Sequence, residues 1–125
     1  MKATQDIWKL CDTIRQTAFD LHVYLRNGHL EKVYENGLAN RLRKTGIKFE
    51  QQCPLTVKDD DGTILGEYYA DLLVEDCLII ELKAVRNLAQ EHWAQVLGYL
   101  RASGLQHGLL INFGAPKIEI KKLIM

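Results

Sequence analysis

Two short apolar runs in the middle of the chain carry charged residues, and this combination restricts how the chain can fold. Asp71 opens the run Leu72-Leu73-Val74, and the run Cys77-Leu78-Ile79-Ile80 leads directly into Glu81-Leu82-Lys83. A desolvated charge without a partner is costly to bury. We therefore expect both runs to be strands whose charged side chains meet one another.

The spacing of the charges predicts how these two strands pair. Glu81 and Lys83 are two residues apart and therefore share one face of a strand. A three-residue loop between Val74 and Leu78 places Asp71 opposite Glu81 on that same face, with Cβ atoms about 5 Å apart. A two-residue loop would place the two carboxylates on opposite faces. Convergence of the carboxylates thus predicts an odd-numbered loop or a bulge.

Two converging carboxylates are suited to a shared divalent cation. Mg²⁺ prefers carboxylate, carbonyl and water oxygens, and Mn²⁺ accepts the same ligands, so the carbonyl of Leu82 is a further candidate ligand. Lys83 would lie beside such a metal, where an ammonium group positions water and neutralises charge on a phosphate. These residues predict metal-dependent phosphodiester cleavage. The open alternatives are a surface ion pair between Glu81 and Lys83, which contributes little, and a structural ion network.

Hydrophobic periodicity predicts an α/β fold. Apolar residues recur at steps of three and four in helical segments and at steps of two in strands. The expected helices cover about residues 5–26, 30–44 and 88–103, and the expected strands about residues 47–57, 64–74, 77–85, 107–113 and 118–121. This order gives a three-stranded antiparallel meander, then a helix and further strands, in a mixed sheet flanked by helices. The length fits one domain over residues 1–125.

Composition limits the classes of function. Sixteen basic residues balance sixteen acidic ones, which argues against tight non-specific DNA binding but not against a nuclease with an acidic metal site. The three cysteines, Cys11, Cys53 and Cys77, are widely spaced, so we expect reduced thiols in a cytoplasmic protein. No apolar run has the length of a membrane span, and no signal peptide is expected. Asp59-Asp60-Asp61-Gly62 is interpreted as an exposed turn, because it lacks the pattern of a calcium-binding loop.

The pattern Asp71…Glu81-x-Lys83 resembles the PD-(D/E)xK nuclease superfamily, with Ala70 in place of the usual proline. Over about residues 10–124 the chain also resembles one bacterial branch, the GxxExxY proteins. Five segments carry this resemblance: Gly28–Tyr34, Tyr69–Val74, Glu81–Val85, His92–Gln95 and Gly108–Phe113. The resemblance implies a restriction-endonuclease-like core, nucleic acid as the substrate, with DNA favoured over RNA, and Mg²⁺ (or Mn²⁺) as the cofactor.

The resemblance also implies roles for residues of the helices. An acidic residue on the first core helix often completes the metal site in this superfamily, which implicates Glu31, with Glu35 on the same helix face as the second candidate. The alternative is that Glu31 only stabilises the helix start through the helix dipole. Tyr34 is expected to pack between helices and not to touch substrate.

Gln95 and Tyr99 lie four residues apart on one helix face. This spacing resembles a motif that follows the Glu-x-Lys strand in RecB-type exonucleases, where the glutamine contacts the site or the nucleic acid. His92, on nearly the same face, is either a phosphate contact or a half-buried histidine bonded to a carboxylate. Arg86, just after the Glu-x-Lys strand, is the basic residue best placed to contact substrate.

The sequence therefore predicts a metal-dependent nuclease in which Asp71, Glu81, Lys83, Glu31 and Gln95 take part in catalysis. The alternative function is a catalytically silent module that keeps the nuclease fold and acts through a protein partner. A chain of 125 residues has little surface for specificity, and a homodimer or a protein partner would supply more. No association with a membrane is expected.

Overall fold

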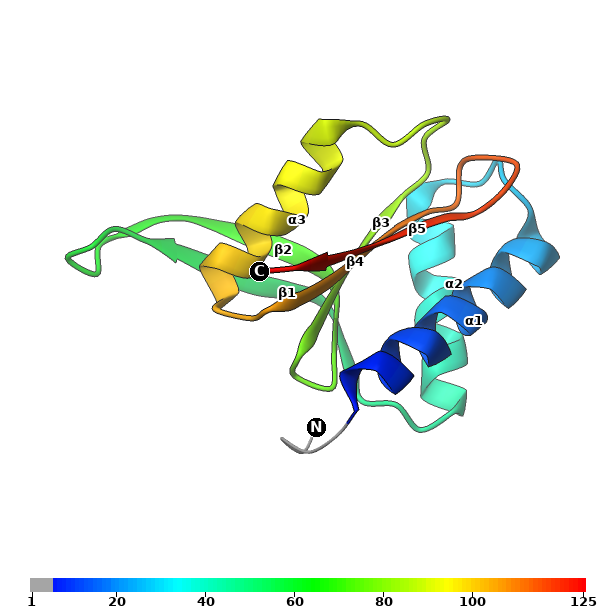
Figure 1. The fold of residues 1–125 in the computed structure, drawn as a ribbon, viewed down its shortest axis with the longest axis horizontal. Helices are drawn as coiled ribbons and strands as arrows, with labels where there is room; N and C mark the ends of the chain where they lie inside the picture. Colours follow the sequence, from blue (N-terminus) through cyan, green and yellow to red (C-terminus); the bar gives the residue numbers. More distant parts are fainter. Residues whose placement is uncertain (1–5) are drawn as a thin grey trace.

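The computed structural model describes residues 6–125, which form three helices and five strands (Figure 1). In chain order these are α1 (Ile7–Leu25), α2 (Glu31–Lys44), β1 (Phe49–Lys58), β2 (Ile64–Val74), β3 (Leu78–Lys83), α3 (Gln90–Ser103), β4 (His107–Asn112) and β5 (Glu119–Ile124). None of the helices within residues 6–125 combines the length and the apolar character that crossing a lipid bilayer requires.

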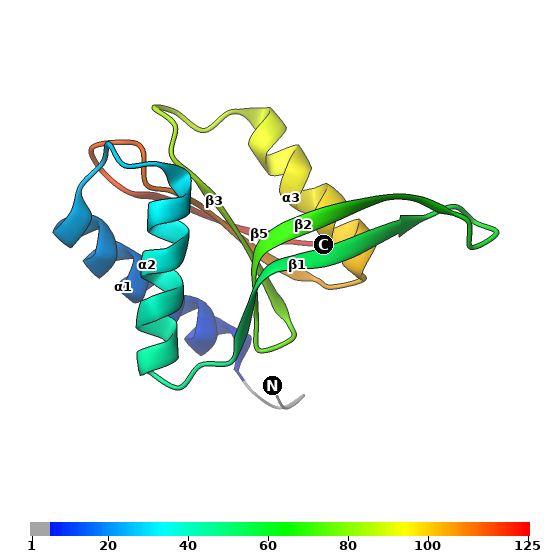
Figure 2. The same ribbon diagram turned by 180° about the vertical axis from the view of Figure 1, so that it is seen from behind.

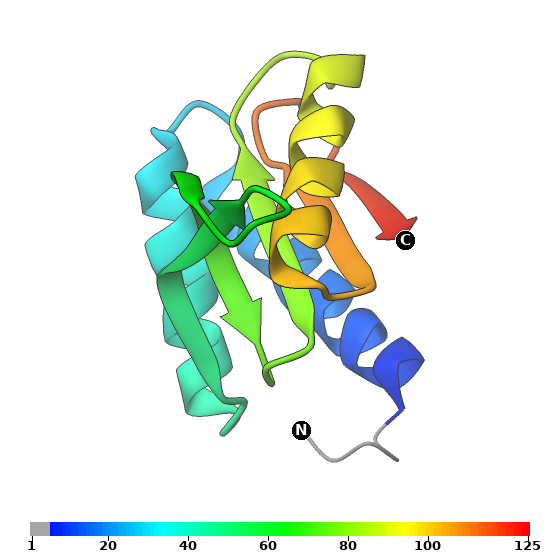
Figure 3. The same cartoon turned by 90° about the vertical axis from the view of Figure 1, so that its left-hand side faces the viewer.

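The five strands form one mixed sheet in the order β1-β2-β3-β4-β5. The pairs β1–β2, β2–β3 and β4–β5 are antiparallel, whereas β3 and β4 are parallel because α3 connects them as a crossover. Helices α1 and α2 cover one face of the sheet and α3 covers the other, as Figures 2 and 3 show. The predicted α/β architecture, a meander followed by a helix and further strands, is confirmed.

Alternation along β3 sorts its side chains between two apolar clusters. Leu78, Ile80 and Leu82 are fully buried in the cluster formed with α1 and α2. Ile79 is buried in the second cluster, which includes Val96 and Leu100 of α3. Because side chains alternate along a strand, Glu81 and Lys83 share the α3 face with Ile79.

Most element boundaries lie within two residues of those predicted, and the differences have local causes. The predicted helix start at Gln5 lies outside the described residues. Helix α3 begins at Gln90 and not at Leu88, because the Nδ1 atom of His92 accepts a hydrogen bond from the Ala89 N–H and caps the helix. The last strand is longer than expected, since it pairs with β4 as far as Ile124.

The β1–β2 hairpin bends where it passes the middle of the sheet. Phe49 packs against the α1–α2 cluster, whereas Cys53 and Leu55, on the same side of the alternation, lie in the α3 cluster. Between them Gln52 adopts φ 53°, in the left-handed region that non-glycine residues rarely occupy. Figure 1 shows the hairpin curving and projecting beyond the sheet. The bend lies beside Asp71, which is flanked by Ala70 and Leu72, the β2 partners of Cys53 and Gln51.

Candidate active site

The connection between β2 and β3 determines where the two strand carboxylates lie. Val74 pairs with Leu78, so Glu75, Asp76 and Cys77 form a three-residue loop. Glu75 and Asp76 both have positive φ angles, 51° and 59°, which allow the tight reversal. The predicted odd-numbered loop is confirmed, and the ladder pairs Leu72 with Ile80, which are the chain neighbours of Asp71 and Glu81.

Asp71 and Glu81 meet at this point on the α3 face. The main-chain N–H of Asp71 donates to Oε1 of Glu81 at 3.2 Å, and the N–H of Leu82 donates to Oδ2 of Asp71 at 2.7 Å. The two acidic residues are only 7% and 4% exposed. Leu82 thus contacts Asp71 through its N–H, and the role of its carbonyl as a metal ligand stays a prediction.

Burial of the two carboxyls perturbs their ionisation. Desolvation, reinforced by the charge of Asp71, raises the pKa of Glu81 to about 8. Desolvation also raises the pKa of Asp71, although the hydrogen bonds from the Leu82 N–H and the Gln52 side chain oppose this change. Two carboxyls held together at this depth favour either a shared proton or a bound cation, which would offset the repulsion between their charges.

Lys83 lies on the same face, with its Nζ atom 3.8 Å from Oε2 of Glu81. Its side chain is only 16% exposed. The surface ion pair considered as an alternative is therefore wrong, because neither partner is at the surface. A structural ion network is also weakened, since Asp71 and Glu81 share a face and do not point to opposite sides of the sheet.

Helix α2 brings two more carboxylates to this region. Glu31 is half-buried, and desolvation followed by the charge of Asp71 raises its pKa, while Lys83 opposes the increase. Among residues 6–125 no hydrogen bond or ion pair engages its carboxylate. Glu35, by contrast, is buried and bonded to Lys32 at 3.1 Å and to two glutamine side chains. Glu31 is therefore available as a ligand, whereas Glu35 is already occupied.

Gln52 connects α2 to the strand carboxylates, and sequence reasoning missed this residue. Its Nε2 atom donates to Oε1 of Glu35 at 2.9 Å and to Oδ1 of Asp71 at 3.1 Å. Since Leu82 already bonds the other oxygen of Asp71, both oxygens of this carboxylate are oriented. Alternation placed Gln52 on the solvent side of a strand, and no signal in the sequence indicated its positive φ.

The loop before α2 is anchored by the tyrosine of the Gly-x-x-Glu-x-x-Tyr segment. The Tyr34 hydroxyl donates to the Arg26 carbonyl at 2.5 Å and accepts from the His29 N–H at 3.1 Å. Gly28, with φ 114°, turns the chain between them. The Tyr34 ring is fully buried and stacks on Phe113, with 4.7 Å between ring centroids. Tyr34 therefore packs inside the fold, as predicted, and fixes the loop that leads to Glu31.

Helix α3 contributes the predicted glutamine and tyrosine. The Gln95 Nε2 atom donates to the Tyr99 hydroxyl at 3.1 Å. Burial first, and then the charges of Glu81 and Asp71, raise the pKa of Tyr99 to about 12. His92 caps α3 through Nδ1, and no carboxylate within residues 6–125 bonds its ring.

The segment after Lys83 is held by Asn112, a second residue that the sequence interpretation missed. Its Oδ1 atom accepts from the N–H groups of Val85 and Gly114, both at 3.0 Å. Its Nδ2 atom donates to the Val85 carbonyl at 2.9 Å. These hydrogen bonds hold Val85 outside the sheet, and β3 therefore ends at Lys83 and not at Val85 as predicted. Arg86 follows as an exposed residue that lines a groove with the Asn27–His29 loop.

The sequence matches the family model of the PD-(D/E)XK nuclease superfamily over residues 8–123. The chain belongs to this superfamily. No curated protein matches it. Its fold is similar to the crystal structure of SSO0001 (TM-score 0.60, 19% identity, covering 74% of this chain and 48% of that one). An alkaline exonuclease from Laribacter hongkongensis aligns with a TM-score of 0.41 and 14% identity, covering 69% of this chain and 51% of the other. The chain thus spans about half the length of both proteins.

Three acidic residues of the candidate site carry the kind of ligand atoms that a divalent cation requires. Asp71, Glu81 and Glu31 supply carboxylate oxygens, the ligands that Mg²⁺ and Mn²⁺ prefer. Burial raises the pKa of all three, as expected where a cation could compensate the negative charge. The chemistry of these donors therefore fits a divalent metal, although the ligand oxygens of the three carboxylates do not all lie within 4.8 Å of one another.

A second acidic cluster, Asp59-Asp60-Asp61, lies at the tip of the β1–β2 hairpin. Its side chains are exposed, and two of them accept local hydrogen bonds, Asp59 from the Asp60 N–H and Asp61 from the Thr63 N–H. These bonds are typical of a turn. The hairpin tip is therefore explained as a solvated turn, and Asp71 with Glu81 remains the better candidate metal site.

Proposed function

We propose that this member of the PD-(D/E)XK superfamily is a divalent-metal-dependent nuclease that hydrolyses phosphodiester bonds of nucleic acid. The observation that carries the proposal is the buried pair Asp71 and Glu81, side by side on one sheet face with Lys83. Such a pair is costly without a compensating charge, and it occurs in a chain that belongs to the PD-(D/E)XK nuclease superfamily.

Asp71, Glu81 and Glu31 would hold the metal, Mg²⁺ or Mn²⁺, with the Leu82 carbonyl as a further ligand. When bound, the cation would lower the pKa of a water molecule and stabilise negative charge on the phosphate. The ammonium group of Lys83 lies where it can orient the attacking water and offset charge on the phosphate oxygens.

Residues of α3 and the neighbouring loop would position the substrate. Gln95 donates to Tyr99, which leaves the amide oxygen of Gln95 able to accept a hydrogen bond from water. Tyr99 and His92 lie on the same helix, and His92 retains Nε2 for a phosphate contact. Arg86, exposed beyond the end of β3, would contact the backbone of the nucleic acid.

Several finer assignments belong to the same proposal. The spacing of Gly28, Glu31 and Tyr34 supports placement in the bacterial GxxExxY branch: Gly28 turns the loop, Tyr34 anchors it, and Glu31 supplies a carboxylate for the proposed metal site. We propose DNA as the favoured substrate over RNA, a cytoplasmic location and a single domain over residues 1–125.

Isothermal titration calorimetry with Mg²⁺ and Mn²⁺ tests the metal site. Wild type should bind metal, Asp71→Asn should not, and Asp61→Asn at the hairpin tip should bind like wild type. A screen of single- and double-stranded DNA and RNA should show cleavage by wild type and none by Lys83→Ala with an unchanged circular dichroism spectrum. Loss of metal binding in Asp61→Asn instead of Asp71→Asn would overturn the site.

The alternative function is a silent module that acts through a protein partner. The observation that favours a partner or a second copy is the exposure of Phe19, Val23 and Tyr24 on α1. A wild-type protein that binds metal but cleaves no nucleic acid would support this alternative. Light scattering coupled to size-exclusion chromatography then distinguishes a homodimer from a monomer that needs another protein.

A further inference from the structure

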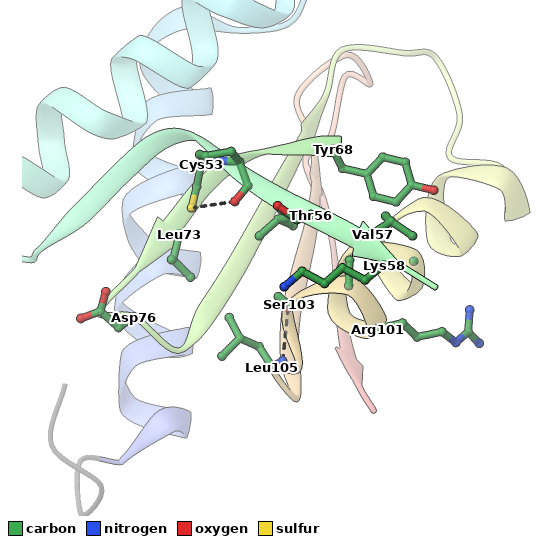
Figure 4. Close-up of a pocket in the computed structure, with 14 residues that line it drawn as sticks. Cys53, Thr56, Val57, Lys58, Tyr68, Leu73, Asp76, Arg101, Ser103 and Leu105 are labelled. Atoms are coloured by element: carbon green, nitrogen blue, oxygen red, sulfur yellow. Dashed lines mark hydrogen bonds between the residues drawn. The ribbon is translucent and has the colours of Figure 1, made fainter. Parts of the chain in front are cut away.

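A groove lies between the β1–β2 hairpin and α3 and is lined by residues of both. It has a volume of about 960 Å³. Figure 4 shows Lys58 on β1, Tyr68 on β2 and Arg101 on α3 among the residues that line it. None of its lining residues belongs to the set proposed for metal binding and hydrolysis.

A contact between two tyrosine rings links the groove lining to Tyr99 of α3. Tyr68, which lines the groove, lies 5.2 Å from Tyr99 between ring centroids. Tyr99 in turn accepts a hydrogen bond from Gln95, and the charges of Glu81 and Asp71 contribute to its raised pKa. A chain that occupies the groove would therefore pass Tyr68 as it approaches the carboxylates.

The lining combines an accessible aromatic ring with positive charge. Tyr68 is 44% exposed, and Lys58 and Arg101 are exposed cations. The acidic residue of the lining, Asp76, forms an ion pair with Lys48 at 2.8 Å, which offsets its charge. Basic side chains that follow a phosphate backbone, together with aromatic rings that stack on bases, are typical of single-strand binding.

Charge also argues against a duplex in this groove. Non-specific duplex binding depends on many phosphate contacts, whereas the groove offers two cations and the whole chain has a formal net charge of +0. Affinity must therefore come partly from stacking, and only unpaired bases expose their faces to a ring such as Tyr68. The aspartates of the hairpin tip would repel a strand that ran further along the hairpin.

We propose that this groove binds an unpaired segment of nucleic acid and directs it to the carboxylates, with Tyr68 stacking on a base and Lys58 and Arg101 contacting phosphates. The inference rests on the proposed nuclease function and narrows its substrate class to single strands or single-stranded ends. It assigns the β1–β2 hairpin a role in substrate binding.

Fluorescence anisotropy with a labelled oligothymidylate tests the groove, with the full chain carrying Lys83→Ala to prevent cleavage. Tyr68→Ala should weaken binding about tenfold, within the range measured for loss of one stacked base, and Tyr68→Phe should retain affinity because it keeps the ring. Arg101→Glu should also weaken binding about tenfold and reduce its salt dependence. The control Lys121→Glu, an exposed change on β5, should bind normally.

A duplex containing the same strand should bind at least about tenfold more weakly than the single strand. Unchanged affinity in both Tyr68→Ala and Arg101→Glu would refute the proposal that this groove binds single strands. Equal affinity for duplex and single strand would refute it as well. Both variants change exposed side chains, and circular dichroism would verify their folding.

Cleavage assays separate this inference from the nuclease proposal. If wild type cleaves DNA, Asp71→Asn does not and Tyr68→Ala cleaves at the wild-type rate, the nuclease proposal stands and the groove fails. If wild type binds a single strand through Tyr68 and Arg101 but cleaves nothing, the groove stands and the nuclease proposal fails.

Discussion

Replacing Glu81 by glutamine should stabilise the protein when metal is removed by a chelator. Burial holds the pKa of Glu81 at about 8, compared with the ordinary value of 4.5 that applies to the unfolded chain. Between these two values the folded state binds more protons than the unfolded state. The free energy of unfolding must therefore fall as pH rises from about 4.5 to about 8.

The magnitude follows from the two pKa values. Neutral pH lies about 2.5 pH units above the ordinary value, and each unit corresponds to about 1.4 kcal/mol. The folded state therefore loses about 3 kcal/mol at pH 7 by keeping Glu81 protonated. Glutamine has nearly the same shape without the charge, and its Oε1 can still accept from the Asp71 N–H. The charge of Lys83 lowers the pKa of Glu81, and this effect is already contained in the value of about 8.

Urea denaturation of wild type and Glu81→Gln, at about pH 5 and about pH 7 with chelator, measures this difference. The variant should be more stable by about 2–3 kcal/mol near neutral pH, and the difference should shrink towards pH 5. Excess Mg²⁺ should stabilise wild type but not the variant, because ligand binding stabilises only the state that binds. A wild-type protein that gains stability from pH 5 to pH 8 without metal would refute the reasoning. So would a glutamine variant no more stable than wild type at neutral pH.

Three further substitutions test the contacts that hold the residues and loops of the site in place. Gln52→Ala removes the amide that orients Asp71 and Glu35. Metal affinity measured by calorimetry should therefore fall about 10- to 100-fold while the fold persists. Wild-type affinity in this variant would contradict the positioning role of Gln52. Tyr34→Phe deletes both hydroxyl hydrogen bonds of the loop before α2. The free energy of unfolding in urea should fall by about 1–3 kcal/mol, and the His29 amide should exchange its hydrogen faster. Unchanged exchange would exclude anchoring of the loop by the hydroxyl. Gly114→Ala places a Cβ against the backbone of Ala84 and Val85 and should destabilise by about 1–3 kcal/mol, whereas Gly66→Ala, with open space around the position, should have a much smaller effect on thermal unfolding.

The strand pair of the candidate site could be predicted because the relevant forces are local. Apolar runs on both sides of Glu75-Asp76 define two adjacent strands, and a period of two places Glu81 and Lys83 on one face. The remaining unknown was the loop length, and convergence of the carboxylates required an odd number. That requirement agrees with the pairing of Val74 and Leu78.

The choice between the two glutamates of α2 could not be made from the sequence. Glu31 and Glu35 lie one turn apart on the same helix face, so helical spacing treats them alike. What distinguishes them is β1, because Gln51 and Gln52 bond Glu35, whereas the Glu31 carboxylate has no hydrogen-bond partner in the described part of the chain. Those contacts depend on how the strand crosses the helix, which no local pattern records.

Asn112 did leave a signal that could have been used. It ends the apolar run Leu109-Leu110-Ile111, and a polar side chain at the end of a buried strand needs hydrogen-bond partners. The structure supplies them from Val85, Gly114 and Glu119. The partners themselves were not predictable, because they belong to the loop after β3 and to the next strand.

The bend of the β1–β2 hairpin explains why side chains from both helical layers reach the same carboxylates. Glu35 comes from α2 on one side of the sheet, yet Gln52 bonds it and Asp71 together. Tyr99 comes from α3 on the other side, and its pKa is raised in part by Glu81 and Asp71. A straight hairpin would keep the layers apart, so the left-handed conformation of Gln52, which costs on the order of 1 kcal/mol or more, is best understood as the local strain that allows the site to assemble.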